Sequence, residues 1–102
     1  MLEVVKLLER LPKNVRDAIL YYRKNREEAL SLCERASDKT HKQAFLSSYY
    51  FNKDKLSGYL WALEDVGLIT NAEHQALCDF ELKFAFVDTD AKAEGGTDNA
   101  ED

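Results

Sequence analysis

The sequence has few of the residues that interrupt helices or cross-link a chain. Its 102 residues include one proline, four glycines and two cysteines. This scarcity excludes a turn-rich sandwich and a disulfide-stapled scaffold, and it leaves long stretches free to form helices. No apolar run approaches the roughly 20 residues of a membrane span, and Glu3 lies where a secretory signal would carry positive charge. We therefore expect a cytoplasmic protein with reduced thiols.

Motifs for catalysis and cofactor binding are also missing. The sequence contains no glycine-rich phosphate loop and no Cys-x-x-Cys pair. His74 and Cys78 lie four residues apart, a spacing that suits two metal ligands or a thiol and its base. The remaining metal-ligand candidates are Cys33 and His41, which flank a predicted turn. Cys33 needs no metal to account for it, because it lies on the apolar face of a predicted helix and can pack there as a small apolar side chain. We expect no catalytic residue, no metal and no cofactor.

Charge is unevenly divided along the chain. Residues 1–55 carry a net charge of +4 from 12 basic and 8 acidic side chains, and residues 56–102 carry −9 from 2 and 11. The overall charge of −5 argues against nucleic acid as the default partner. Two interpretations of the division stay open: the halves attract each other within the fold, or the basic half contacts an acidic partner.

Apolar residues recur at helical spacing along most of the chain. Residues 2–11 predict a short helix, and Pro12 ends it or begins the next. A second helix is expected over 13–36 and a third over 39–66, with Asp38 as the N-cap between them. Each follows a heptad seam of alternating four- and three-residue steps: Val15, Ile19, Tyr22, Arg26, Ala29, Cys33 and Ala36 in one, and Phe45, Tyr49, Asn52, Leu56, Tyr59, Leu63 and Val66 in the other.

These two helices are predicted to fold back on each other as an antiparallel hairpin. In the register set by a turn at residues 38–40, Arg26, the one charged seam residue, lies opposite Asn52, the one amide. We expect the two to share a layer, because a polar layer can fix the register of a helix pair. The segment 52–54 also offers a point at which the third helix could be interrupted.

The clearest local signal lies between the third helix and a fourth. Gly67 suits the left-handed residue that closes a helix. Thr70 and Glu73 have the spacing of a capping box, in which each residue's side chain bonds the other's backbone N–H. A helix is therefore expected to end near Val66 and another to begin at Asn71.

The residues around this turn resemble a known family signature: Leu60, Leu63, Asp65, Gly67-Leu68-Ile69-Thr70 and Glu73. They are similar to the SHOCT class of short helical hairpins, in which a leucine-rich helix, a Gly-Leu/Ile-Ile-Thr turn and a glutamate precede a second helix. The resemblance covers about 20 of the 102 residues. It departs at His74, where the family usually has phenylalanine, and over 75–80, where it is usually lysine-rich. It implies an interaction or oligomerisation module rather than an enzyme.

The end of the chain is expected to be part helix and part disordered tail. Residues 71–86 favour a fourth helix, although alternating apolar residues at 80–86 leave a strand as the alternative. Residues 88–102 hold six acids, one lysine and no large apolar side chain, which predicts a disordered acidic tail. Residues 1–87 are expected to form a single all-α domain, an antiparallel three- or four-helix assembly around the central hairpin.

Aromatic residues off the seam of the third helix are the best candidates for binding a protein. Tyr50, Phe51 and Trp61 suit a protein partner or self-association, because tyrosine and tryptophan dominate interface energetics. Their alternative role is to pack on the first or fourth helix. We expect a non-enzymatic interaction protein that binds a protein partner or forms a homo-oligomer through this helix, with no membrane association.

Nucleic acid is the second class of partner. The candidate phosphate contacts are Arg16, Arg23, Lys24, Lys39 and Lys42. Tyrosines near them could stack on bases, but a helix after Gly67 that carries Lys83 as its only cation is ill suited to reading the major groove. A further alternative is an acidic inhibitor that mimics nucleic acid, using the acidic C-terminal half.

Overall fold

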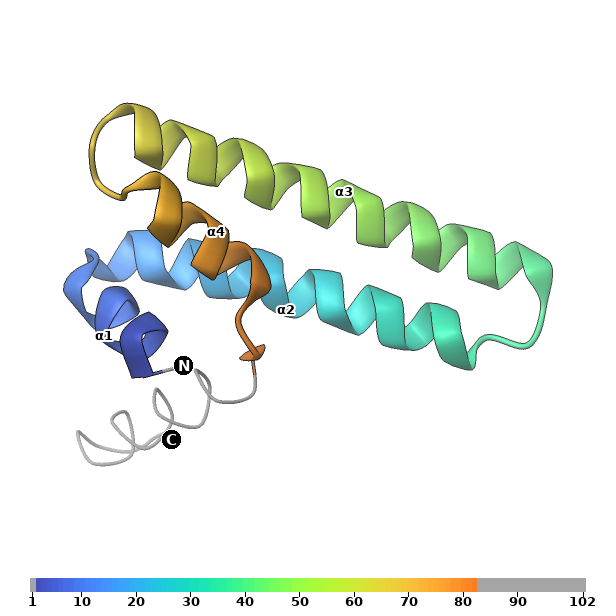
Figure 1. Cartoon of the computed structure of the whole chain (residues 1–102). Coiled ribbons are helices and arrows are strands. Elements are labelled where there is room, and N and C mark those ends of the chain that lie inside the picture. The colour runs from blue at the N-terminus through green and yellow to red at the C-terminus, as the bar shows by residue number, and fades with distance from the viewer. Residues whose placement is uncertain (1, 83–102) are drawn as a thin grey trace.

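The computed structural model describes residues 2–82, and this part of the chain contains four helices and no strand (Figure 1). They are α1 (Leu2–Arg10), α2 (Lys13–Arg35), α3 (Lys39–Asp65) and α4 (Asn71–Asp79). The long helices α2 and α3 form an antiparallel hairpin, and the short helices α1 and α4 pack near one end of it (Figure 1). The predicted all-α architecture around a central hairpin is therefore confirmed. The predicted tail, 88–102, lies outside the described residues.

The turn between the long helices follows the predicted capping chemistry. The Asp38 carboxylate accepts a hydrogen bond from the backbone N–H of His41 at 2.8 Å and also contacts its ring. The backbone hydrogen bond is the main reason that the pKa of Asp38 lies below its usual value. On the α2 side of the turn, the Cys33 thiol lies 3.5 Å from the Lys42 carbonyl oxygen. Toward the other end of the hairpin, the rings of Tyr22 and Tyr59 lie 6.1 Å apart.

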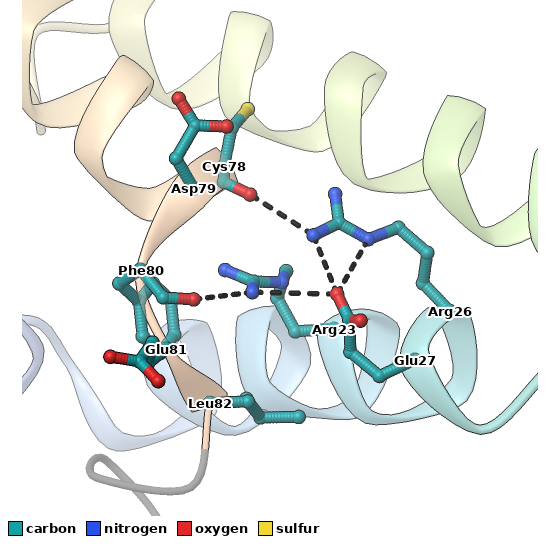
Figure 2. A pocket seen from close by; sticks show the side chains of 8 residues that line it. All are labelled: Arg23, Arg26, Glu27, Cys78, Asp79, Phe80, Glu81 and Leu82. Carbon is teal, nitrogen blue, oxygen red and sulfur yellow. Dashed lines mark hydrogen bonds and ion pairs between the residues drawn. The ribbon is translucent and has the colours of Figure 1, made fainter. Parts of the chain in front are cut away.

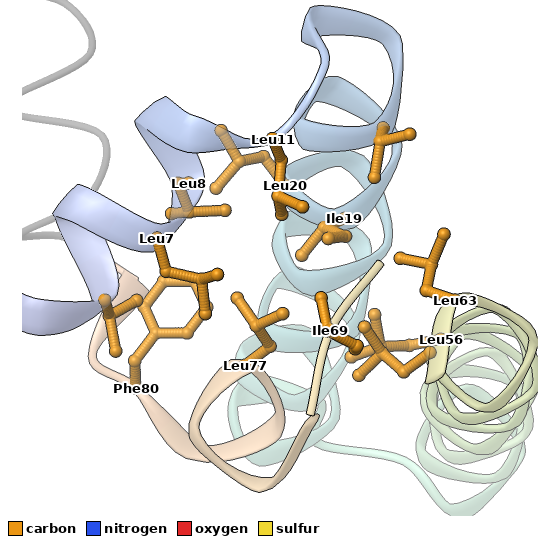
Figure 3. Close-up of a cluster of buried hydrophobic side chains, with 13 residues drawn as sticks. Leu7, Leu8, Leu11, Ile19, Leu20, Leu56, Leu63, Ile69, Leu77 and Phe80 are labelled. Atoms are coloured by element: carbon orange, nitrogen blue, oxygen red, sulfur yellow. The ribbon is translucent and has the colours of Figure 1, made fainter. Parts of the chain in front are cut away.

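The core lies at the end of the hairpin that carries α1 and α4 (Figure 3). The largest fully buried side chains are Ile19, Leu56, Leu60 and Leu77, which come from α2, α3 and α4. The apolar face of α1 closes the core on its outer side with Val4, Leu7 and Leu8, and Leu11, which follows the helix, is buried with them. Arg10 of α1 forms a 2.7 Å ion pair with Glu73 of α4.

The turn from α3 to α4 is fully specified by local hydrogen bonds. Gly67 has a φ of 81°, and its N–H donates to the Glu64 carbonyl at 3.0 Å while that of Leu68 donates to the Leu63 carbonyl at 2.9 Å. This pair of bonds is the Schellman motif, which needs a left-handed residue at its centre. Thr70 and Glu73 form the predicted capping box with bonds of 3.1 and 2.8 Å. The turn places Ile69 in the core.

Removing the threonine hydroxyl should weaken this boundary by a modest and measurable amount. Thr70→Ala leaves the Glu73 N–H without its side-chain acceptor, so we expect the free energy of unfolding to fall by about 1 kcal/mol. Thr70→Ser keeps the hydroxyl and should lose less than half of that. Urea denaturation followed by circular dichroism measures both variants. Equal losses for alanine and serine would show that the hydroxyl bond does not stabilise the turn.

One sequence-based expectation is wrong in the described residues. Helix α4 ends at Asp79, and Phe80 already has an extended backbone with φ −66° and ψ 157°, so the helix expected over 71–86 stops early. Residues 83–86 lie outside the described part. Helix α3 runs unbroken through the segment 52–54, so the alternative of an interruption there does not hold. No helix among residues 2–82 has the length and apolar character to cross a membrane.

Arg26 and Asn52, which are predicted to share a layer, bond to different neighbours within residues 2–82, and the shared layer stays a prediction. The Arg26 guanidinium donates to the Glu27 carboxylate and, at 3.1 Å, to the Cys78 carbonyl of α4. The buried Asn52 amide donates to the Ser48 carbonyl one turn earlier, at 2.9 Å. Each side chain is satisfied by a different neighbour because α4, which the two-helix register ignores, offers Arg26 a helix C-terminus.

Candidate functional site

The part of the hairpin that includes the turn between α2 and α3 extends beyond the short helices (Figure 1). The last buried residue of α2 is Ala29 and the first buried residue of α3 is Asn52. Between them, residues 30–51 include no buried side chain at all. We call residues 30–51 the free arm. It is the part of the described chain in which two helices contact each other with nothing packed on either face.

The free arm is nevertheless rich in apolar side chains. Seven are only half-buried: Leu30, Leu32, Cys33, Ala36, Phe45, Leu46 and Tyr49. Tyr50 and Phe51 are exposed, at 51% and 60% of their surface. A helix pair that is apolar on more than its seam needs a further partner to exclude water. This surplus makes the free arm the candidate binding surface of the described chain.

The three aromatic residues predicted to bind a partner do not form one patch. Tyr50 and Trp61 are eleven residues apart, about three turns, and so lie on the same side of α3. Phe51 projects about 100° away from Tyr50. Trp61, 51% exposed, rests edge-on against the His74 ring with centroids 4.9 Å apart. Trp61 therefore borders α4 outside the free arm, which removes it from the arm's own surface.

Helix α4 marks one side of the hairpin, and that side continues along the free arm. On α3 it is the side of Trp61 and Glu64, because both contact His74 of α4. Leu46 and Tyr50 fall on this side by helical spacing, within about 60° of Trp61 around the axis. On α2 it is the side of Arg23, which bonds α4, and Leu30 projects within about 20° of Arg23. We call this surface of residues 30–51 the α4 side of the arm.

Where α4 ends, two arginines of α2 hold its last carbonyl groups (Figure 2). Arg23 donates to the Leu77 carbonyl at 2.9 Å and the Phe80 carbonyl at 2.5 Å, and Arg26 donates to the Cys78 carbonyl. The Arg23 guanidinium also lies 4.3 Å from the centre of the Phe80 ring. Cations at a helix C-terminus satisfy its free carbonyls and its dipole. These bonds explain why α4 ends at Asp79, because the arginines take the place of the next helical turn as donors to its last carbonyl groups.

The cavity beside these arginines has a volume of about 470 Å³, and the two arginines are already paired with Glu27 and with carbonyl groups at the end of α4. Glu27 accepts from Arg26 at 2.8 Å and lies 3.5 Å from Arg23. Asp79 and Glu81 add two further acids to the lining. Burial, and next the neighbouring Arg26, lower the pKa of Arg23 from its ordinary value. The cluster therefore acts as an internal clamp on α4 rather than as an anion site.

The chain matches no protein-family model, and no curated protein or solved structure is similar to it. The function therefore has to be argued from the surface itself.

The basic residues considered for nucleic acid do not form a common surface. Arg23 is 3% exposed and its two terminal nitrogens donate to carbonyl groups at the end of α4, so it is not available to a phosphate on the surface. Arg16 is half-buried. Lys39 and Lys42 are exposed in the first turn of α3, at the tip of the arm, whereas Lys24 lies on α2 about 17 Å before that helix ends. The scattered placement offers no continuous track for a phosphate backbone.

The described residues also supply little for metal or thiol chemistry. No group of three or more potential ligands gathers within residues 2–82, and Cys33 and Cys78 are both free thiols. His74, paired with Cys78 in the sequence analysis, instead contacts Glu64 at 2.9 Å and is buried. Burial, and next the charge of Asp79, raise the pKa of the Cys78 thiol. A raised pKa disfavours the thiolate that a nucleophile needs.

Cys78 should accordingly react slowly with alkylating reagents. In a Cys33→Ser variant, which isolates Cys78, we expect iodoacetamide at about pH 8 to modify the folded protein several-fold more slowly than the urea-unfolded protein, because the folded thiol is less ionised and half-buried. Mass spectrometry of quenched samples gives both rates. Faster labelling of the folded protein would reveal an activated thiol and contradict the assignment.

The sequence analysis missed two features that the structure makes central. Leu30 and Leu46 were not candidates for partner binding, although each lies one position beyond its helix seam, which is a signal of a wider apolar face. The role of Arg23 had no local signal, because its partners are carbonyl groups more than 50 residues away. Gly67, Thr70 and Glu73 take the structural roles expected of them.

Proposed function

We propose that this chain is a non-enzymatic protein-interaction module whose free arm packs against another protein. The observation that carries the proposal is that residues 30–51 bury no side chain although ten of them are apolar or aromatic. Binding a helical partner would remove these side chains from water, at roughly 25 cal/mol for each Å² of apolar surface. The resemblance of the Gly67 turn to the SHOCT class supports the same functional class.

The other end of the hairpin, which carries α1 and α4, supports this function because it is stabilised without help from the free arm. The core and the arginine bonds hold α1 and α4 on one end of the hairpin. This end gives the arm a fixed base, from which α2 and α3 extend as two helices that are already paired. Pairing of the helices before a partner binds reduces the entropic cost of association.

Site-specific photocrosslinking in cells that make the protein tests this function. A benzophenone amino acid placed at position 46, on the α4 side of the arm, should yield a covalent adduct with a protein on irradiation. The same amino acid at position 62, an exposed alanine of α3 outside the arm, serves as the matched control and should yield little. Equal yields at the two positions, or no adduct at position 46, would refute the proposed function.

A further inference from the structure

We infer that the partner of the free arm is an acidic amphipathic helix of another protein, which packs along α3 on the α4 side of the arm. The inference rests on the proposed function and states the chemistry of the partner for the same surface. On α3 this surface is formed by five residues, which we call the basic stripe: Lys39, Lys42, Leu46, Tyr50 and Lys53. Its last member, Lys53, lies two residues beyond the arm.

The basic stripe lies on one face of α3. At about 100° for each residue, its five members fall within a sector of about 80° around the helix axis. The same sector includes Glu64, which contacts His74 of α4, so the stripe continues the side of α3 on which α4 packs. Four of the five residues are exposed and Leu46 is half-buried. Helix α4 therefore shows how a helix packs on this side, and a partner helix would occupy the same side nearer the tip of the arm.

The charge on this stretch of α3 has one sign. Residues 39–53 include three lysines and no acidic residue. None of the three lysines forms an ion pair within residues 2–82, and Lys53 instead lies over the Tyr50 ring, 5.9 Å from its centre. Exposed cations without a counter-charge favour a partner that brings acidic side chains to them.

The acidic residues of the arm do not neutralise the basic stripe. The arm contains two, Glu34 and Asp38. Asp38 is engaged as the N-cap of α3, where it bonds His41. Glu34 belongs to α2 and lies at the opposite edge of the α4 side. A partner helix on this side therefore meets three cations along one edge and a single acid along the other.

The apolar members of the stripe decide which kind of acidic partner fits. Leu46 and Tyr50 separate the lysines at the tip from Lys53, and they leave about 16 Å of the helix face without a cation. The phosphates of a nucleic-acid strand follow one another at roughly 3.4 Å along the helix axis, so most of them would meet apolar side chains. An amphipathic helix instead packs its own apolar residues on Leu46 and Tyr50. Its acidic residues, up to about 21 Å apart, reach the lysines at both ends of the stripe.

Charge reversal combined with photocrosslinking at position 46 tests the inference. The stripe variant carries Lys39→Glu, Lys42→Glu and Lys53→Glu together, and it should lower the yield of the adduct by about tenfold or more, because acidic side chains then face an acidic partner. The control variant has the same net charge but reverses three exposed lysines outside the stripe, Lys6→Glu, Lys24→Glu and Lys55→Glu. It should leave the yield unchanged. Circular dichroism of the purified variants checks that both are folded.

The segment of the partner that is joined to position 46 gives a second measurement, which needs no charge-reversed variant. Tandem mass spectrometry of the digested adduct identifies this segment. We expect apolar residues at helical spacing, with acidic residues that outnumber the basic ones.

The outcomes separate this inference from the proposed function. A neutral or basic segment of another protein overturns the inference and leaves the proposed function standing, as does a yield that the stripe variant and the control variant lower equally. An adduct with a second copy of this chain likewise overturns the acidic partner but not the interaction function. An adduct with the C-terminal residues of the same chain, or the absence of any adduct at position 46, removes both.

Discussion

Replacing Leu60 by alanine should lower the free energy of unfolding by about 3–4 kcal/mol. Leu60 is fully buried, with 0% of its surface exposed, in the core that α1, α4 and the hairpin share. Alanine leaves a cavity that surrounding helices cannot fill, because α4 is fixed by the arginine bonds and the Gly67 turn. For a domain of this size, the loss corresponds to a fall in melting temperature of roughly 15–25 °C.

The matched control is Leu46→Ala, the same change on the same helix and on the same side of the hairpin. Leu46 lies in the free arm and is only half-buried, so we expect a loss below about 1 kcal/mol. Urea denaturation at low micromolar concentration measures both variants. Comparable losses would mean that the arm has a core of its own in the single chain, contrary to the structure.

Replacing Arg23 by methionine should cost about 2–3 kcal/mol. Methionine keeps the apolar stem but leaves the Leu77 and Phe80 carbonyls without their buried donors and removes the contact with the Phe80 ring. Relief from burying a charge offsets part of this loss. The carbonyl bonds should outweigh it, because two acceptors at the end of α4 lose a charged partner at once.

Lys24→Met is the control for Arg23→Met. Lys24 is the next residue of α2 and is exposed, so its replacement should change the free energy of unfolding by less than about 0.5 kcal/mol. Thermal unfolding of the two variants gives the comparison. Equal stability would show that the guanidinium bonds to α4 contribute nothing, and the explanation for the end of this helix would then fail.

The helix boundaries that rest on local chemistry were predictable from sequence. Asp38, Gly67 and Thr70 act through bonds to residues within five positions of themselves, so their spacing in the sequence carries the information. The apolar face of the first helix and the hairpin of the next two follow from periodicity in the same way. These features fixed the fold class.

The features that sequence reasoning missed depend on distant parts of the chain. The end of α4 is set by arginines of α2, and no pattern within residues 71–86 encodes that contact. The same end of α4 supplies the Cys78 carbonyl group to which Arg26 donates. Periodicity also describes the long helices evenly from end to end, and it cannot show that the short helices bury only one half of them. The free arm is recognised as a candidate surface only from the structure, which shows where α1 and α4 cover the hairpin and where they do not.

Hydrogen exchange of the backbone amides tests the central claim most directly, because it reports which parts of the hairpin have a core. In the dilute protein we predict that amides of residues 30–51 exchange much faster than those of residues 15–29 and 52–65. An arm that is as well protected as the rest of the hairpin would contradict the account.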